Sequence, residues 1–182
     1  MRYHSGAQRF TAGIASGALG GAALLSFLSA ASVFDQDPWW RFPNLLGTTF
    51  YGAFALRAGP GLPTLAGAAL EVLLCGVIGG LFGWVFAGAV PGARLMLLGM
   101  ATGLVWNYAA ERLYERLSPL VPLYSASFPL TFGYLVFGAF LGTAGWFLSK
   151  PPKPAPPPAP PLPSATPESG AAPPPPEDAG RE

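Results

Sequence analysis

The chain has 182 residues, of which 51% are hydrophobic and only 10% are charged, and its formal net charge is +1. Soluble domains typically carry about 25% charged residues, so this composition places the chain among membrane proteins, with room for one domain. A net charge near zero offers no basic surface for nucleic acid. The single cysteine, Cys75, excludes an intrachain disulfide and a cysteine cluster for zinc or iron–sulfur.

The first apolar run covers residues 10–34 and is long enough to cross a bilayer, which takes about 20 apolar residues. Three glycines spaced four residues apart lie on one helical face of this run: Gly13, Gly17 and Gly21. Such faces let helix backbones approach closely, so we expect a packed transmembrane helix. The alternative is a cleaved signal peptide, with Arg2 and Arg9 as its basic end and a small-residue cleavage site at residues 29–31.

A long connection, residues 35–64, follows this run and opens with the turn-forming sequence Asp-Gln-Asp-Pro. Trp39 and Trp40 suit the headgroup level of a membrane. Pro43 is a suitable first residue for a short helix, which would be too short to cross the membrane. We therefore expect an interfacial or re-entrant helix over about residues 39–57, with a plain structured loop as the alternative.

The second apolar run, residues 65–90, contains a single charged residue, Glu71. Its small residues form overlapping repeats with a spacing of four: Gly76 with Gly80, and Gly79 with Gly83. A tight turn at Pro91 separates it from the third run, residues 94–110, so we expect these two spans to be antiparallel neighbours. The third run carries Gly99 and Gly103 and is expected to continue as a helix past the membrane surface, through Glu111 to Arg116.

The fourth apolar run covers residues 128–148 and contains Gly138 and Gly142. The composition then changes abruptly, because 14 of the 22 prolines follow residue 150. Proline runs favour extended polyproline II, and this segment has too little apolar surface to fold. We expect a four-helix transmembrane domain over residues 1–149 and a disordered Pro-rich tail over residues 150–182. The fold class is therefore all-α, an antiparallel bundle of four transmembrane helices.

Two sequence patterns recur at corresponding positions of the two halves. The second and fourth spans both read GxxxGxxGW, ending at Trp84 and Trp146, and the first and third both read GxA[ST]G, starting at Gly13 and Gly99. Matched spans are two crossings apart and would have the same orientation, as in a duplicated helical hairpin. The alternative is a chance match between glycine-rich helices.

Glu71 is the candidate functional residue. It lies about seven residues into its span, roughly 10 Å at a rise of 1.5 Å per residue. A charged acid at the membrane centre costs about 2.5–3.5 kcal/mol, so such a residue is expected to face the bundle interior and to have a partner. The expected partners on an antiparallel third span are Asn107, Tyr108 and Arg112, with Arg57 as another candidate. The group would bind an ion or a proton, or would fix the register of the helices as a structural acid.

The sequence contains no Ser/His/Asp, Cys/His, phosphate-loop or metal-ligand spacing, so we expect no enzymatic activity and no cofactor. Lysine and arginine counts favour an N-terminus inside the cell, with six positive residues inside and four outside. This predicts a multi-pass protein of the cell membrane with both termini in the cytoplasm.

The glycine-rich spans contain Gly79-Gly80-Leu81-Phe82-Gly83 and the run from Phe137 to Gly142. In this the chain resembles the small, uncharacterised four-helix inner-membrane proteins of bacteria, whose spans carry G-xx-FG and YG-xxx-G patterns. The resemblance covers the four spans and implies a fold but no activity. In that pattern a histidine lies early in the second and fourth spans, where this chain has Glu71 and Gly133-Tyr134.

These features predict a structural or accessory membrane module that associates with the lipid bilayer and with copies of itself or other membrane subunits. Every span contributes a small-residue face to such association: Gly13, Gly17, Gly21, Gly76, Gly80, Gly83, Gly99, Gly103, Gly138 and Gly142. The alternative function is a small transporter or channel that uses Glu71 as an intramembrane ion- or proton-binding carboxylate.

Overall fold

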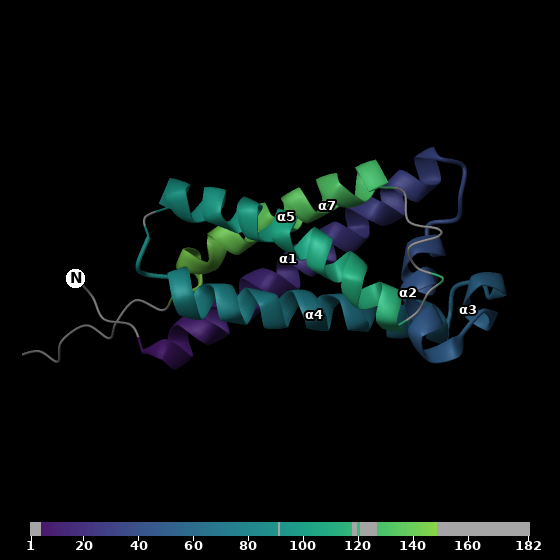
Figure 1. Ribbon diagram of the computed structural model, residues 1–182, viewed down its shortest axis with the longest axis horizontal. Coiled ribbons are helices and arrows are strands. Elements are labelled where there is room, and N and C mark those ends of the chain that lie inside the picture. The colour runs from purple at the N-terminus through teal and green to yellow at the C-terminus, as the bar shows by residue number, and fades with distance from the viewer. Residues whose placement is uncertain (1–4, 91, 118–119, 121–126, 149–182) are drawn as a thin grey trace, which may run out of the picture. The chain divides into compact units, whose positions relative to one another are not determined.

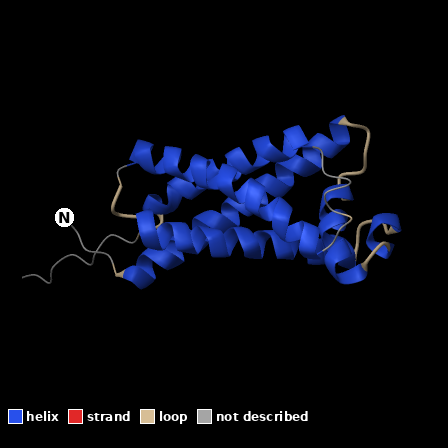
Figure 2. Ribbon diagram, in the orientation of Figure 1, coloured by secondary structure: helices blue, strands red, loops and turns tan. Residues whose placement is uncertain are grey.

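The computed structural model describes residues 5–90, 92–117, 120 and 127–148, and all regular structure within them is helical (Figures 1 and 2). The four long helices in this part of the chain are α1 (Gly6–Phe34), α4 (Leu62–Phe86), α5 (Gly92–Leu117) and α7 (Ser127–Leu141), which continues into the 3-10 helix η1 (Gly142–Trp146). Two short helices, α2 (Arg41–Tyr51) and α3 (Phe54–Arg57), lie at the end where α4 begins (Figure 1). The all-α fold class is confirmed. The Pro-rich tail, residues 150–182, lies outside the described residues, and its disorder stays a prediction.

Local sequence signals set the two ends of α1. The Ser5 hydroxyl accepts a hydrogen bond from the backbone N–H of Gln8 at 3.2 Å, and the Gln8 side chain accepts one from the N–H of Ser5 at 3.1 Å. This reciprocal capping satisfies two of the unpaired donors at a helix start. The helix ends at Phe34, and Gln36 then adopts a φ of 63°, a left-handed conformation that turns the chain towards α2.

The connection after α1 is helical where a short helix was predicted. α2 begins two residues before Pro43 and ends at Tyr51, and the following Gly52 has a φ of 56° that is readily adopted only without a Cβ. Close backbone contacts press α2 against the start of α4. A Cβ added to Gly67 would overlap the carbonyl oxygen of Pro43, and one added to Gly47 would overlap that of Pro63.

A polar network fixes the same contact. The Asn44 side chain donates to the carbonyl oxygen of Ala58 at 2.9 Å and accepts a hydrogen bond from the Thr64 hydroxyl at 2.5 Å. Asn44 and Thr64 are both buried. Hydrogen bonding of buried polar groups offsets the cost of removing them from water. The segment between α1 and α4 is therefore held against the start of α4.

Within the described residues, three helices are long and apolar enough to cross a membrane: Gly6–Phe34, Leu62–Phe86 and Phe128–Trp146. They correspond to the first, second and fourth predicted spans. The predicted third span lies within α5, which continues past residue 110 to Leu117 as expected, but α5 is not among these three. Two polar residues inside the predicted span, Arg94 and Asn107, lower its hydropathy.

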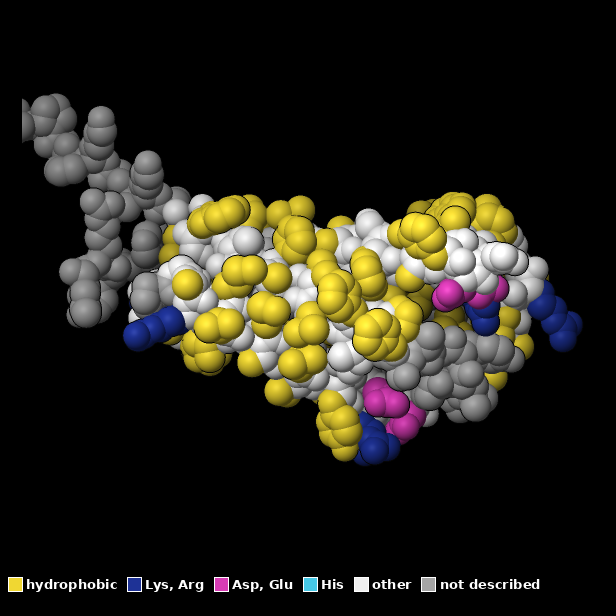
Figure 3. Space-filling model, turned by 90° about the horizontal axis from the view of Figure 1, so that it is seen from above, with side chains coloured by type: hydrophobic (Ala, Val, Ile, Leu, Met, Phe, Trp, Pro, Cys, Tyr) yellow, Lys and Arg dark blue, Asp and Glu magenta, His cyan; other side chains and the backbone are white. Residues whose placement is uncertain are grey.

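The outer surface separates apolar from charged side chains. On the face seen in Figure 3, hydrophobic side chains are spread over the long helices, one Lys or Arg group lies at the left end, and the other charged side chains lie in the right half. Leu73 and Val77 of α4 and Leu97 and Val105 of α5 are about half exposed or more. Such a surface would be unfavourable in water, but it matches the hydrocarbon core of a bilayer with polar ends at its two interfaces. The arrangement is thus compatible with a membrane protein.

Glycines bring α1 and α4 into backbone contact along an antiparallel crossing. A Cβ added to Gly13 would overlap the carbonyl oxygen of Gly79, and one added to Gly17 would overlap that of Cys75. A Cβ on Gly83 would lie 2.6 Å from the Cα of Gly13. Contacts this close are available only to residues without a Cβ, and they maximise dispersion between the two backbones.

A second antiparallel pair, α5 and α7, is built in the same way. A Cβ on Gly99 would overlap the carbonyl oxygen of Gly138, and one on Gly103 would overlap that of Tyr134. A Cβ on Gly142 would lie 2.5 Å from the Cα of Met96. The two pairs meet mainly where α1 contacts α7.

The expectation that α4 and α5 are close neighbours is wrong. These helices touch only sparsely, whereas α4 packs extensively on α1 and α5 packs extensively on α7. A short turn requires two helices to be close at one end only. Beyond the turn, the glycine faces select the packing partner, because they allow the closest approach.

The two pairs correspond to each other in a register different from the one predicted. Gly13 and Gly17 of α1 contact Gly79 and Gly83, just as Gly99 and Gly103 of α5 contact Gly138 and Gly142. The match between the first and third helices follows the GxA[ST]G pattern. The match between the second and fourth helices does not follow GxxxGxxGW. That pattern aligns Gly138 with Gly76, whereas in the structure Gly138 corresponds to Gly79, three residues later.

Candidate functional site around Glu71

Glu71 is fully enclosed by three helices. It lies nine residues after the start of α4, about 14 Å along the helix axis, and its exposed fraction is 1%. The Tyr114 hydroxyl of α5 donates to its Oε2 atom at 2.5 Å, and the Tyr134 hydroxyl of α7 donates to its Oε1 atom at 3.2 Å. The Cys75 Sγ, one turn further along α4, donates to Oε1 at 3.7 Å.

The partners are as deeply buried as the acid. The exposed fractions are 4% for Tyr114, 1% for Tyr134 and 0% for Cys75. The ion pairs formed among the described residues lie elsewhere, so Glu71 is held by uncharged donors alone. A buried polar group without partners would cost about 1–3 kcal/mol, and in this cluster the carboxyl and both hydroxyls are engaged. We call these four residues the Glu71 cluster.

The predicted partners of Glu71 lie elsewhere. Asn107 faces α7 and donates to the Thr131 hydroxyl at 3.4 Å. Tyr108 is 63% exposed, and Arg112 lies over its ring, with 5.4 Å between the guanidinium carbon and the ring centroid. Arg112 also forms an ion pair with Glu115 at 3.1 Å, and the prediction that these three residues pair with Glu71 is wrong.

The partners were predicted from their depth on an antiparallel third span, and depth does not determine which face of α5 turns inward. The face that turns inward carries the buried residues Gly99, Gly103, Ala110 and Tyr114. Tyr108 and Arg112 lie on a different face, and Arg57 lies at the end of α3, where it forms no ion pair with Glu71. Spacing alone could have identified Tyr114, because it follows Gly103 by 11 residues, or three helical turns.

Tyr134 had a weaker sequence signal. It lies in the fourth predicted span, and Glu71 lies in the second. In the structure these two residues are hydrogen-bonded to each other. The sequence of the fourth span shows a single tyrosine among mainly apolar residues, and nothing in it identifies the helix that the tyrosine faces.

The chemistry available to the Glu71 cluster is narrow. A carboxyl group surrounded by hydroxyls and a thiol can exchange a proton and can accept or donate hydrogen bonds. The described part of the chain contains no group of three or more His, Cys, Asp or Glu residues arranged to hold a metal ion. The hydrogen bonds of the cluster connect α4 to α5 and to α7, two helices with which α4 otherwise makes few contacts.

The predicted packing glycines divide into three groups. Seven lie where an added Cβ would overlap or closely approach the backbone or the Cβ of a facing helix: Gly13, Gly17, Gly21, Gly83, Gly99, Gly103 and Gly138. Gly142 belongs with them through Met96, and Gly80 instead faces the side chains of Phe10 and Ile14. Gly76 is buried but has space, because an added Cβ would meet its nearest neighbour, Ile14, at 3.9 Å. Gly79, which the aligned repeat left out, is at the centre of the α1–α4 contact.

Comparison with protein-family models, curated proteins and solved structures found no match to this chain.

Proposed function

We propose that the chain is a multi-pass integral membrane protein with four transmembrane helices in an antiparallel bundle, α5 being the third. α5 packs along α7 through Gly99 and Gly103, and its outward side chains Leu104 and Val105 are apolar. Its charged residues lie near its two ends, Arg94 at the start and Glu111 to Arg116 beyond the span. The moderate hydropathy of α5 is offset inside the bundle, where Asn107 is hydrogen-bonded to Thr131.

The proposed role is that of a structural or accessory membrane module. The observation that carries this proposal is the complete engagement of the only ionisable acid inside the spans. Glu71 accepts hydrogen bonds from two tyrosines on two other helices and has no charged partner among the described residues, an arrangement suited to fixing helix register. A transport site would need the carboxyl to be open to water or to an ion at some stage.

Association with copies of the chain or with other membrane subunits is proposed to use surfaces other than the glycine faces. The glycines of α1, α4, α5 and α7 already face one another inside the chain. The segment α2–α3 instead presents aromatic side chains, with Phe50 60% exposed, Tyr51 40% and Phe54 66%. Exposed aromatic residues at the end of a bundle are suited both to the membrane interface and to a protein contact.

The proposed location is the bacterial inner membrane, with both termini in the cytoplasm and α2–α3 on the outer side. α1 is proposed to remain in the mature protein rather than to be removed as a signal peptide, because it contacts both α4 and α7. Trp39 and Trp40 then lie at the outer headgroup level, where tryptophan is enriched.

The alternative function is a small transporter or channel that uses Glu71. Its support is the general observation that an ionisable residue inside a membrane span often marks an ion or proton path. This alternative requires water to reach the carboxyl in some conformation of the bundle.

The substitution Glu71→Gln distinguishes the two proposals. The glutamine side chain keeps the volume and can still accept a hydrogen bond, but it adds two donors where the tyrosines already donate, so a structural role predicts less folded protein. The measurement compares the folded fraction after mild extraction and the ion flux into proteoliposomes, with Glu115→Gln as the control for loss of an acid. A folded Glu71→Gln variant that has lost a flux shown by the wild type would overturn the structural role.

A further inference from the structure

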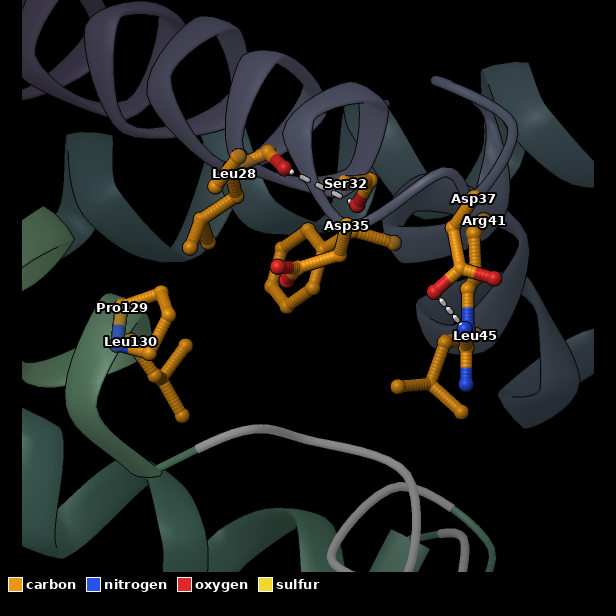
Figure 4. Close-up of a pocket in the computed structure, with 10 residues that line it drawn as sticks. Leu28, Ser32, Asp35, Asp37, Arg41, Leu45, Pro129 and Leu130 are labelled. Atoms are coloured by element: carbon orange, nitrogen blue, oxygen red, sulfur yellow. Dashed lines mark hydrogen bonds and ion pairs between the residues drawn. The ribbon is translucent and has the colours of Figure 1, made fainter.

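A cavity of about 110 Å³ lies where α1 ends and α7 begins, next to the start of α2 (Figure 4). Its walls combine apolar side chains, including Leu28, Leu45 and Leu130, with three charged residues. These are Asp35, Asp37 and Arg41. In Figure 4 the Asp35 carboxylate turns into this space, while Asp37 is paired with Arg41 on the opposite side. The cavity therefore has a charged wall at the proposed outer interface of the membrane.

An apolar groove of about 440 Å³ continues from this cavity along α1 and α7. Its walls are mainly aromatic: Phe27, Phe34, Phe128 and Phe132. Ala31, Asp35 and Pro129 line both spaces, so the charged cavity and the apolar groove adjoin at Asp35. Phe27 and Phe34 are seven residues apart on one helix, which gives the groove a length of about 10 Å.

The cavity is lined by two carboxylates and only one guanidinium. Arg41 forms an ion pair with Asp37. Among the described residues, none forms a hydrogen bond or an ion pair with the Asp35 carboxylate. Within the described part of the chain, the cavity therefore presents one carboxylate without a partner, which can accept hydrogen bonds, and one guanidinium that keeps further N–H groups for an anion.

We propose that this composite site binds a glycerophospholipid with a primary ammonium headgroup, of the phosphatidylethanolamine class. The ammonium donates to Asp35, the phosphate lies against Arg41, and one acyl chain occupies the aromatic groove. The site and the lipid have their polar and apolar parts in the same order. The charged cavity lies at the proposed membrane interface, where the headgroup would be, and the aromatic groove leads from it into the membrane, where the acyl chain would be. The inference rests on the proposed placement of the four helices in a bilayer.

The headgroup chemistry distinguishes this lipid from its common neighbours. A primary ammonium has three N–H donors for the Asp35 carboxylate, whereas the quaternary ammonium of phosphatidylcholine has none. Phosphatidylglycerol carries a net negative charge, which the unmatched Asp35 charge disfavours. A hydrogen bond between charged groups is strong enough to change binding about 10-fold or more.

The test uses the full-length chain in nanodiscs that contain equal amounts of phosphatidylethanolamine, phosphatidylcholine and phosphatidylglycerol with matched acyl chains. Native mass spectrometry of the released protein measures the lipid retained. We expect one phosphatidylethanolamine per chain, preferred about 10-fold over the other two, and a loss of that preference in Asp35→Asn. Glu115→Gln, which removes an exposed acid far along the chain, is expected to keep the preference.

A second variant tests the groove independently of the charge. Ala31→Leu places a larger side chain where the cavity and the groove adjoin, and it is expected to lower retention of all three lipids at this site. Equal retention of the three lipids by the wild type, or a preference unchanged in both variants, would overturn the proposal. Failure of the membrane placement itself would be seen separately, as release of the chain from membranes by alkaline carbonate.

Discussion

Replacement of Gly79 by alanine tests the glycine contact between α1 and α4. The added methyl group would overlap the carbonyl oxygen of Gly13 and would lie 2.6 Å from the Cα of Gly17. Ordinary contact between carbon atoms begins near 3.5 Å, so the two helices have to separate by roughly 1 Å. A gap of about 0.5–1 Å already forfeits a quarter to a half of the dispersion energy of each affected atom pair.

We expect Gly79→Ala to lower the free energy of unfolding by about 1–3 kcal/mol, the usual cost of overpacking a close contact. The matched control is Gly76→Ala, three residues earlier on the same helix. An added Cβ there would meet Ile14 at 3.9 Å, which is ordinary contact. That control is expected to leave stability unchanged or to raise it slightly, because alanine is a better helix former than glycine.

The assay is reversible unfolding of the purified chain in mixed micelles of a mild detergent and dodecyl sulfate, followed by circular dichroism. Gly138→Ala, at the equivalent position of the α5–α7 pair, is expected to cost a similar amount. If Gly79→Ala were as stable as Gly76→Ala, the backbone contact between α1 and α4 would not exist as described.

Three further predictions concern polar groups and one backbone conformation. Tyr134→Phe removes one hydrogen bond to Glu71 and is expected to cost about 0.6–1.7 kcal/mol in the same unfolding assay, while Tyr51→Phe, at a 40% exposed position, is expected to cost nothing measurable. Equal stabilities of these two variants would contradict the Glu71 cluster. Gln36→Gly relieves a φ of 63° and is expected to raise the thermal midpoint, with a gain of up to about 1 kcal/mol; a lower midpoint would show that the turn does not have this conformation. Asn44→Ala removes the bond to the loop before α4 and is expected to speed proteolysis between α3 and α4, and an unchanged cleavage rate would refute its anchoring role.

The long apolar runs were the most predictable part of the fold. Their length and lack of charge correspond directly to helices that can cross a membrane, and this places residues 10–34, 65–90 and 128–148 on α1, α4 and α7 with η1. The short helix after Trp40 was also predictable, because Pro43 suits the first turn and the stretch before Gly59 is too short to cross a membrane. Each of these features depends on local sequence alone.

The arrangement of the helices was less predictable. The tight turn predicted at Pro91 suggested that α4 and α5 pack together, but a short connection fixes only the neighbouring ends of two helices. The repeat pattern gave the correct register for Gly13 and Gly99, since both have the same spacing and the same small neighbours. For α4 and α7 the pattern aligned Gly76 with Gly138, three residues away from the true equivalent, Gly79. Several glycines of α4 have a four-residue spacing, so the spacing alone does not identify the one in contact.

For the Glu71 cluster, too, one feature could be predicted from local sequence and another depended on helix packing. Burial of the acid followed from the cost of a charge inside a membrane, and the structure places Glu71 in the interior. Its partners depended on the rotation of α5 and α7 about their axes. Those rotations are set by the glycine contacts between α5 and α7. Tyr114 has a sequence signal in its spacing from Gly103, whereas Tyr134 could be assigned to Glu71 only once the packing was known.

We propose that the chain acts as a structural or accessory membrane module and that Glu71 serves its fold. The deciding measurement is native mass spectrometry of the chain, extracted in mild detergent at its native level of expression. We expect a defined assembly, either with copies of the chain or with a fixed second subunit. A lone chain that carries ions into proteoliposomes, and that loses this flux but keeps its fold in Glu71→Gln, would contradict it.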